Sequence, residues 1–70
     1  MAKNDTKTIF NVLSAKARKK EITNTDRKEV RQAVADLAAE IQGGYRLGRQ
    51  EFDTLNSAYD VYREDMNEAF

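Results

Sequence analysis

Hydrophobic residues in the last third of the chain recur at helical spacing. They are separated by steps of three and four positions, at Phe52, Leu55, Tyr59, Tyr62, Met66 and Ala69. This spacing places all of them on one side of an α-helix. The pattern therefore predicts one uninterrupted helix over residues 49–70, about 30 Å long at ~1.5 Å per residue. We expect the remainder of the chain to pack against it.

A second hydrophobic stripe predicts a helix over residues 27–42. Its members are Val30, Val34, Leu37 and Ile41, widened by Ala33 and Ala38. Asp26 followed three residues later by Glu29 resembles a capping box, in which side chains satisfy the first free N–H groups of a helix. Thr23 and Thr25 are alternative capping residues, because threonine favours the same position.

The first helix is predicted over residues 7–19. Thr6 is a plausible N-cap. We expect residues 1–5 to form a frayed tail. The helix has one apolar face, and Val12 lies at its edge. That face consists of Ile9, Phe10, Leu13 and Ala17. The end of this helix carries several cations, which favourably oppose the negative end of the helix dipole.

A pair of glycines, Gly43-Gly44, indicates where the second helix ends. The segment lacks the Lys-Ser/Thr of a phosphate-binding loop and follows no predicted strand, which indicates a turn. Together the three stripes predict one all-α domain over residues 1–70, a three-helix bundle with a long C-terminal helix. The expected core is Ile9, Phe10, Leu13, Val30, Val34, Leu37, Ile41, Leu47, Phe52, Leu55, Tyr59 and Tyr62.

Composition narrows the class of protein. The chain has 70 residues, 34% of them charged, and contains no cysteine, histidine or proline. Seventy residues make one small domain whose core barely suffices. No apolar run approaches the ~18 residues of a membrane span, and the first residues lack the apolar segment of a signal peptide. We therefore expect a cytoplasmic protein without membrane contact, disulfides or a cofactor.

The same composition argues against an enzyme. Ser14 and Ser57 have no histidine to activate them. Acidic pairs such as Asp60 with Glu64 lie opposite the apolar stripe, whereas a catalytic acid needs a pocket that shifts its pKa. We therefore expect neither catalysis nor a small-molecule substrate.

Charge is divided between the two halves of the chain. Residues 1–31 carry nine Lys/Arg against four Asp/Glu, and residues 32–70 carry three against eight. A short connector between two helices invites comparison with helix-turn-helix proteins. The candidate nucleic-acid contacts are Lys16, Arg18, Lys19, Lys20, Arg27, Lys28 and Arg31. One observation argues against DNA binding: DNA-binding domains of this size usually carry a net positive charge, whereas the net charge of this chain is zero.

Acidic residues of the last helix contradict helix electrostatics. Glu64, Asp65 and Glu68 fall in the final turns of the predicted helix, where acids oppose the dipole. Conflicts of this kind often mark functional surfaces, although acids also simply keep small proteins soluble. The candidate protein-binding residues are an acidic ridge, Asp53, Asp60, Glu64 and Glu68, and an uncovered apolar end, Tyr62, Met66 and Phe70. A homodimer through that end is one expected outcome.

A resemblance to a known family covers residues 45–60. Tyr45, Leu47, Glu51, Phe52, Leu55, Ser57, Ala58 and Asp60 follow the pattern Y-x-L-x3-E-F-x2-L-x-S-A-x-D. This segment resembles the Hha/YmoA nucleoid modulators, small helical proteins that bind H-NS-type DNA silencers through acidic surface residues. The resemblance implies that Asp60 engages a partner.

Taken together, these features predict a non-enzymatic protein that binds and modulates a host or partner macromolecule. Small size, a bipolar surface and no cofactor chemistry are common in accessory regulators, including those encoded by phages and mobile elements. The alternative is a small helix-turn-helix-like DNA-binding transcriptional regulator.

Overall fold

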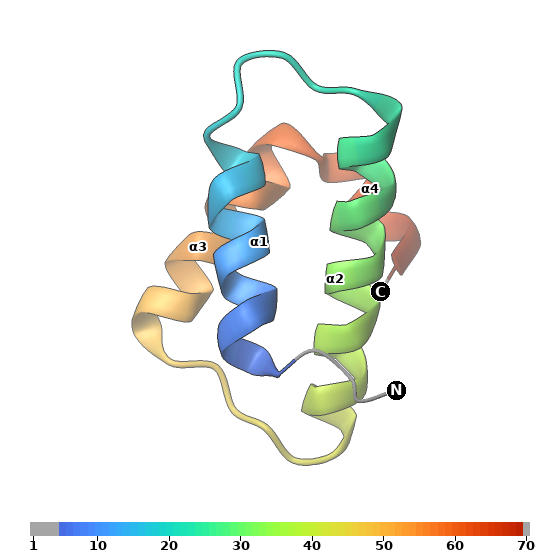
Figure 1. Cartoon of the computed structure of the whole chain (residues 1–70). Helices are drawn as coiled ribbons and strands as arrows, with labels where there is room; N and C mark the ends of the chain where they lie inside the picture. The colour runs from blue at the N-terminus through green and yellow to red at the C-terminus, as the bar shows by residue number, and fades with distance from the viewer. Residues whose placement is uncertain (1–4, 70) are drawn as a thin grey trace.

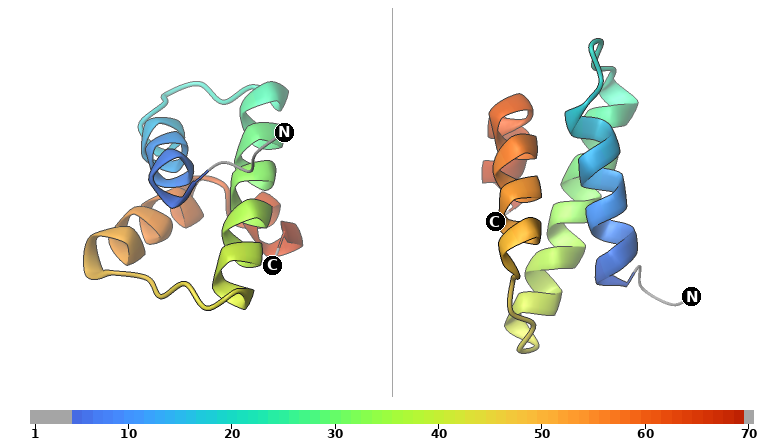
Figure 2. Two further views of the ribbon diagram at one scale, coloured as in Figure 1. Left: turned by 60° about the horizontal axis from the view of Figure 1, so that its bottom comes forward. Right: turned by 90° about the vertical axis from the view of Figure 1, so that its left-hand side faces the viewer.

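The computed structural model describes residues 5–69, which are helical and contain no strand. The helices are α1 (Thr6–Ala17), α2 (Asn24–Gln42), α3 (Arg49–Val61) and α4 (Arg63–Ala69). α1 packs against both α2 and α3, whereas α4 packs against α2 (Figure 1). Figure 2 shows that α1 and α2 form a pair, with the segment after the Gly-Gly turn crossing beneath them to reach α3. The all-α prediction is confirmed, but the prediction of three helices is wrong.

Side-chain caps determine where the first two helices begin. The Asp5 carboxylate accepts a hydrogen bond from the Thr8 N–H at 2.8 Å, so the N-cap is Asp5 and not Thr6. Residues 1–4 lie outside the described part of the chain. Thr23, one of the three candidates for the second cap, forms a capping box with Asp26 at the third helical position, so the box predicted between Asp26 and Glu29 is wrong. α2 consequently begins at Asn24, three residues before the predicted start.

Backbone hydrogen bonds at the Gly-Gly pair terminate α2 as predicted. Gly44 has a φ of 111°, a conformation that side chains other than hydrogen disfavour. Its N–H donates to the Ile41 carbonyl at 3.0 Å, and the Tyr45 N–H donates to the Glu40 carbonyl at 3.0 Å. This is the pattern of a Schellman motif, which satisfies the last free carbonyls of a helix.

A carboxylate also organises the start of α3. Glu51 accepts a hydrogen bond from the Gly48 N–H at 2.7 Å and another from the Tyr45 hydroxyl. These bonds stabilise the carboxylate, and the Tyr45 bond is the main reason that the pKa of Glu51 lies below its ordinary value. The turn after α2 is therefore tied directly to the first turn of α3.

The predicted long C-terminal helix is interrupted at Tyr62. That residue has φ −119° and ψ 39°, outside the helical range, and the chain turns back there so that α4 runs along α2 (Figure 1). The interruption removes the electrostatic conflict predicted for Glu64 and Asp65, whereas Glu68 still lies in the last turn of α4. Glu64 and Asp65 now lie in the first turn of α4, where acids are favourable.

The buried core contains many of the predicted core residues, but not all of them. Its buried hydrophobic members are Ile9, Phe10, Leu13, Val30, Ala33, Val34, Leu37, Ala58, Tyr62 and Met66. Leu47, Leu55 and Tyr59 are only partly buried. Ile41 and Phe52 were predicted to be core residues and are exposed, Phe52 by 54%. In the part of the chain that the structure describes, α2 packs against α1 and α4 and not against α3, so the contact between α2 and α3 that a three-helix bundle would provide is absent.

Candidate functional site

A cluster of charged side chains joins the end of α1, the start of α2 and the α3–α4 bend. We call it the Asp26 cluster. The Asp26 carboxylate is 2.6 Å from the Lys16 Nζ and 2.8 Å from the Lys19 Nζ. Its second oxygen also accepts from the Thr23 N–H at 3.0 Å. The Tyr62 hydroxyl donates to the Lys16 carbonyl at 3.0 Å, which ties the bend to the end of α1.

Within this cluster, Asp26 and Lys16 shift each other's pKa. Hydrogen bonds from Lys16 and Lys19 stabilise the charged carboxylate and hold the pKa of Asp26 far below its ordinary value. Bonds to Asp26 and Glu29 raise the pKa of Lys16. Burial, aided by the negative charge of Asp26, raises the pKa of Tyr62. Asp26 and Lys16 are therefore charged at neutral pH, and Tyr62 is neutral.

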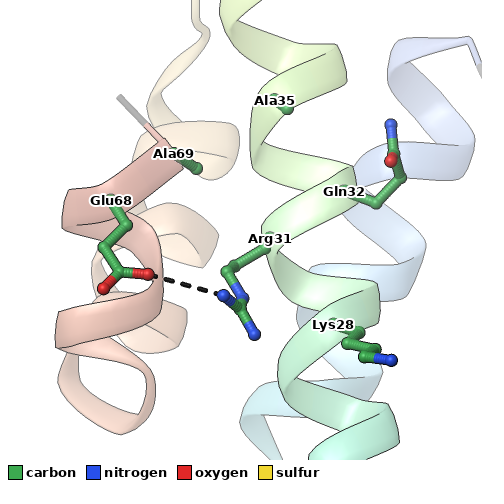
Figure 3. A pocket seen from close by; sticks show the side chains of 6 residues that line it. All are labelled: Lys28, Arg31, Gln32, Ala35, Glu68 and Ala69. Atoms are coloured by element: carbon green, nitrogen blue, oxygen red, sulfur yellow. Dashed lines mark hydrogen bonds and ion pairs between the residues drawn. The ribbon is translucent and has the colours of Figure 1, made fainter.

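A second cluster fastens α4 to α2. The Asp65 carboxylate is buried and lies 3.0 Å from the Arg27 Nε and 3.5 Å from the Arg31 Nε. Arg31 also reaches Glu68 at 3.4 Å, across a groove of about 590 Å³ between the two helices (Figure 3). Because α4 has only seven residues, these ion pairs and the fully buried Met66 account for its position.

The two clusters involve four of the seven predicted nucleic-acid contacts. Lys16, Lys19, Arg27 and Arg31 are each paired with carboxylates of the fold. Arg18, Lys20 and Lys28 are exposed. A basic side chain that is already paired releases little counterion on meeting a phosphate, and counterion release drives non-specific DNA binding. The arrangement therefore provides little support for a DNA-binding surface.

The acidic ridge is not continuous. Its four members are exposed, but they lie in three places. Asp53 borders a groove between α1 and α3 beside Arg18, and Glu68 faces Arg31 on α2. Only Asp60 and Glu64 come together, where they line one hollow at the bend.

The predicted uncovered apolar end is wrong for the residues that the structure describes. Tyr62 is 2% exposed and Met66 is fully buried. Both are covered because α4 turns back along α2 and does not protrude beyond the shorter helices. Phe70, the third member, lies outside the described residues.

The hollow at the α3–α4 bend, which we call the bend hollow, combines apolar and acidic groups. Its volume is about 380 Å³, and its lining includes Ile22, Arg27, Asp60, Val61, Arg63 and Glu64. Ile22 is 41% exposed and Val61 is 37% exposed, so two large apolar side chains meet water beside two carboxylates. Sequence reasoning missed both. The available signal was that Ile22 is an isolated apolar residue in a polar connector and Val61 lies off the apolar stripe.

Ser14 and Ser57 lie in the same groove between α1 and α3 as Asp53. Within residues 5–69 no group of His, Cys, Asp or Glu side chains has the arrangement of a metal site. None of the helices in that range combines the length and apolar character of a membrane span.

Comparisons of the chain with protein-family models, with curated proteins and with solved structures found no match. The resemblance of residues 45–60 to the Hha/YmoA modulators therefore stays a prediction. The function has to be argued from the geometry of the molecule itself.

Proposed function

We propose that this protein is a non-enzymatic binding module that modulates a partner protein, and that it binds this partner through the bend hollow. The observation that carries the proposal is the exposure of Ile22 and Val61 beside Asp60 and Glu64. Exposed apolar side chains rimmed by charge are typical of protein interaction sites.

The charges around the bend hollow favour a basic partner segment. Arg27 is already paired with Asp65, so the remaining charged groups of the lining are two carboxylates, Asp60 and Glu64, and one cation, Arg63. A partner segment with an apolar side chain between Lys or Arg residues would match both features, and opposite charges would also accelerate its approach. The resemblance to the Hha/YmoA modulators supports the same residue, Asp60.

The test is affinity capture from the native host with the purified protein as bait, followed by nuclease treatment. We compare wild type with Asp60→Lys/Glu64→Lys and with Asp36→Lys/Glu40→Lys. The control pair carries the same charge change, but both of its residues lie on α2 and neither lines the bend hollow. The proposal predicts a nuclease-resistant protein partner that wild type and the control capture and the bend variant loses.

Direct titration of the identified partner then measures the loss. Reversing two contacting carboxylates should weaken binding at least about tenfold, mainly in the association rate and mainly at low salt. Equal capture by all three proteins would reject the bend hollow as the site. Capture that disappears with nuclease would favour the DNA-binding alternative.

A further inference from the structure

A single residue joins α3 to α4, and the local sequence does not require a bend there. Tyr62 alone separates the two helices. Sharp bends usually occur at proline or glycine, yet neither occurs after Gly48. The apolar stripe also continues across the joint at helical spacing. The local sequence is therefore compatible with a straight helix, and tertiary contacts hold the bend.

The contacts that hold α4 are made with α2. Apart from the joint itself, α4 packs against no other helix of the described chain. Asp65 pairs with Arg27 and Arg31, and Met66 is buried. A second copy of the chain presents the same α2 surface. Each of these contacts can therefore form between α4 of one copy and α2 of the other, with the same residue pairs as in the monomer.

Straightening the joint would also complete the helical hydrogen bonding. At the bend, the amides of residues 63–65 do not donate to the carbonyls of residues 59–61, as they would in a continuous helix. Tyr62 is the single residue between the two helices, so a change of its φ and ψ to helical values would restore that pattern. Exchange of an identical element through such a hinge is a low-cost route to a dimer.

We propose that this protein forms a domain-swapped dimer in which α3 and α4 become one helix and each α4 packs against α2 of the other copy. The proposal goes beyond the proposed function and has a consequence for it. The bend hollow is lined by residues on both sides of Tyr62, so straightening takes it apart. The dimer is then a form that cannot bind the partner, and protein concentration regulates binding.

The first test compares Arg63→Pro with Arg63→Ala. Arg63 is the first residue of α4, a position that accepts proline, whereas proline inside a continuous helix removes a hydrogen bond and clashes. Light scattering after size-exclusion chromatography should show wild type and Arg63→Ala forming dimers as concentration rises, and Arg63→Pro remaining monomeric. A wild type that is monomeric at every concentration, or an Arg63→Pro that dimerises equally, would overturn the proposal.

The second test exchanges charges between copies. One variant carries Asp65→Arg, and the other carries Arg27→Asp/Arg31→Asp. Within each variant α4 and α2 repel, but in a swapped heterodimer both α2–α4 contacts pair opposite charges. A single chain with all three changes restores the pairing internally and shows that the exchanged side chains fit.

We expect the mixture of the two variants to form a 1:1 dimer by native mass spectrometry, while each variant alone does not. If the triple variant folds as a monomer and the mixture yields no heterodimer, α4 is not exchanged. Both tests use the purified chain alone, so their failure leaves the proposed function standing, and failure of partner capture leaves the dimer standing.

Discussion

At the scale of single residues, Asp26 shows how a buried carboxylate is compensated in so small a protein. It is 2% exposed, and it accepts hydrogen bonds from Lys16, Lys19 and Thr23. A buried charge costs free energy unless such partners satisfy it. The capping role was foreseeable from the sequence because it depends on neighbours three residues apart. The lysine partners were not, since Lys16 lies on α1 and Lys19 lies in the connector that follows it.

Acid should therefore weaken the fold through Asp26. Its folded-state pKa lies below the ordinary value of 3.8, so its ion pairs stabilise the fold fully above that pH, and the stabilisation is lost as pH falls toward the folded pKa. We expect the thermal midpoint of wild type to drop between about pH 4 and about pH 2, and that of Asp26→Asn to be lower at neutral pH and to drop less.

Thermal melts followed by circular dichroism across this pH range measure the effect. Asp53→Asn is the matched control, because Asp53 is exposed and its pH profile should follow that of wild type. Parallel profiles for wild type and Asp26→Asn would show that Asp26 does not contribute to acid sensitivity.

Leu37 tests the core at the same scale. It is fully buried on α2, whereas Ile41, one turn later on the same stripe, is 37% exposed. Leu37→Ala should cost about 2–5 kcal/mol of unfolding free energy, since it leaves a cavity. Ile41→Ala should cost about 1 kcal/mol, because part of its apolar surface already meets water. Urea titrations measure both, and equal costs would contradict the observed packing.

At the scale of elements, the hydrophobic period predicted where helices form and left their ends less certain. The first two stripes of the chain each lie in one helix, the third is divided between α3 and α4, and the Gly-Gly stop is where the pattern placed it. The break at Tyr62 was missed because the stripe keeps its period on both sides of the bend. Glu64 and Asp65 were the signal: acids cost about 0.3–1 kcal/mol each at a helix end but stabilise a helix start.

The two glycines at the end of α2 give a prediction, at Gly44, and its control, at Gly43. Gly44 has a positive φ, whereas Gly43 has φ −81° and ψ 0° in the right-handed region. Gly44→Ala should destabilise the protein by about 1–2 kcal/mol, the cost of a left-handed residue with a side chain. Gly43→Ala should be neutral or slightly stabilising, because its added Cβ approaches no described atom closer than 3.4 Å. Chemical denaturation separates the two, and equal effects would contradict the turn geometry.

At the scale of the whole molecule, the bend decides which surfaces exist. It covers Tyr62 and Met66, places Glu68 beside Arg31 of α2 and brings Glu64 to the hollow that Ile22 and Val61 line. The sequence identified the acidic residues that line the bend hollow but not the apolar ones, because Ile22 lies in a polar connector and Val61 lies off the apolar stripe. The pairing of Arg27 and Arg31 with Asp65 was unforeseeable because Asp65 reaches α2 only when α4 turns back.

The central claim is that α3 and α4 are two helices in the monomer, with α4 on α2. Nuclear magnetic resonance on a dilute, monomeric fraction tests it most directly. We predict that the sequential helical contacts stop at Tyr62 and resume at Arg63, and that Met66 protons show cross-peaks to side chains of α2. Uninterrupted helical contacts from Arg49 to Ala69 in the monomer, with no cross-peak between α4 and α2, would contradict the account.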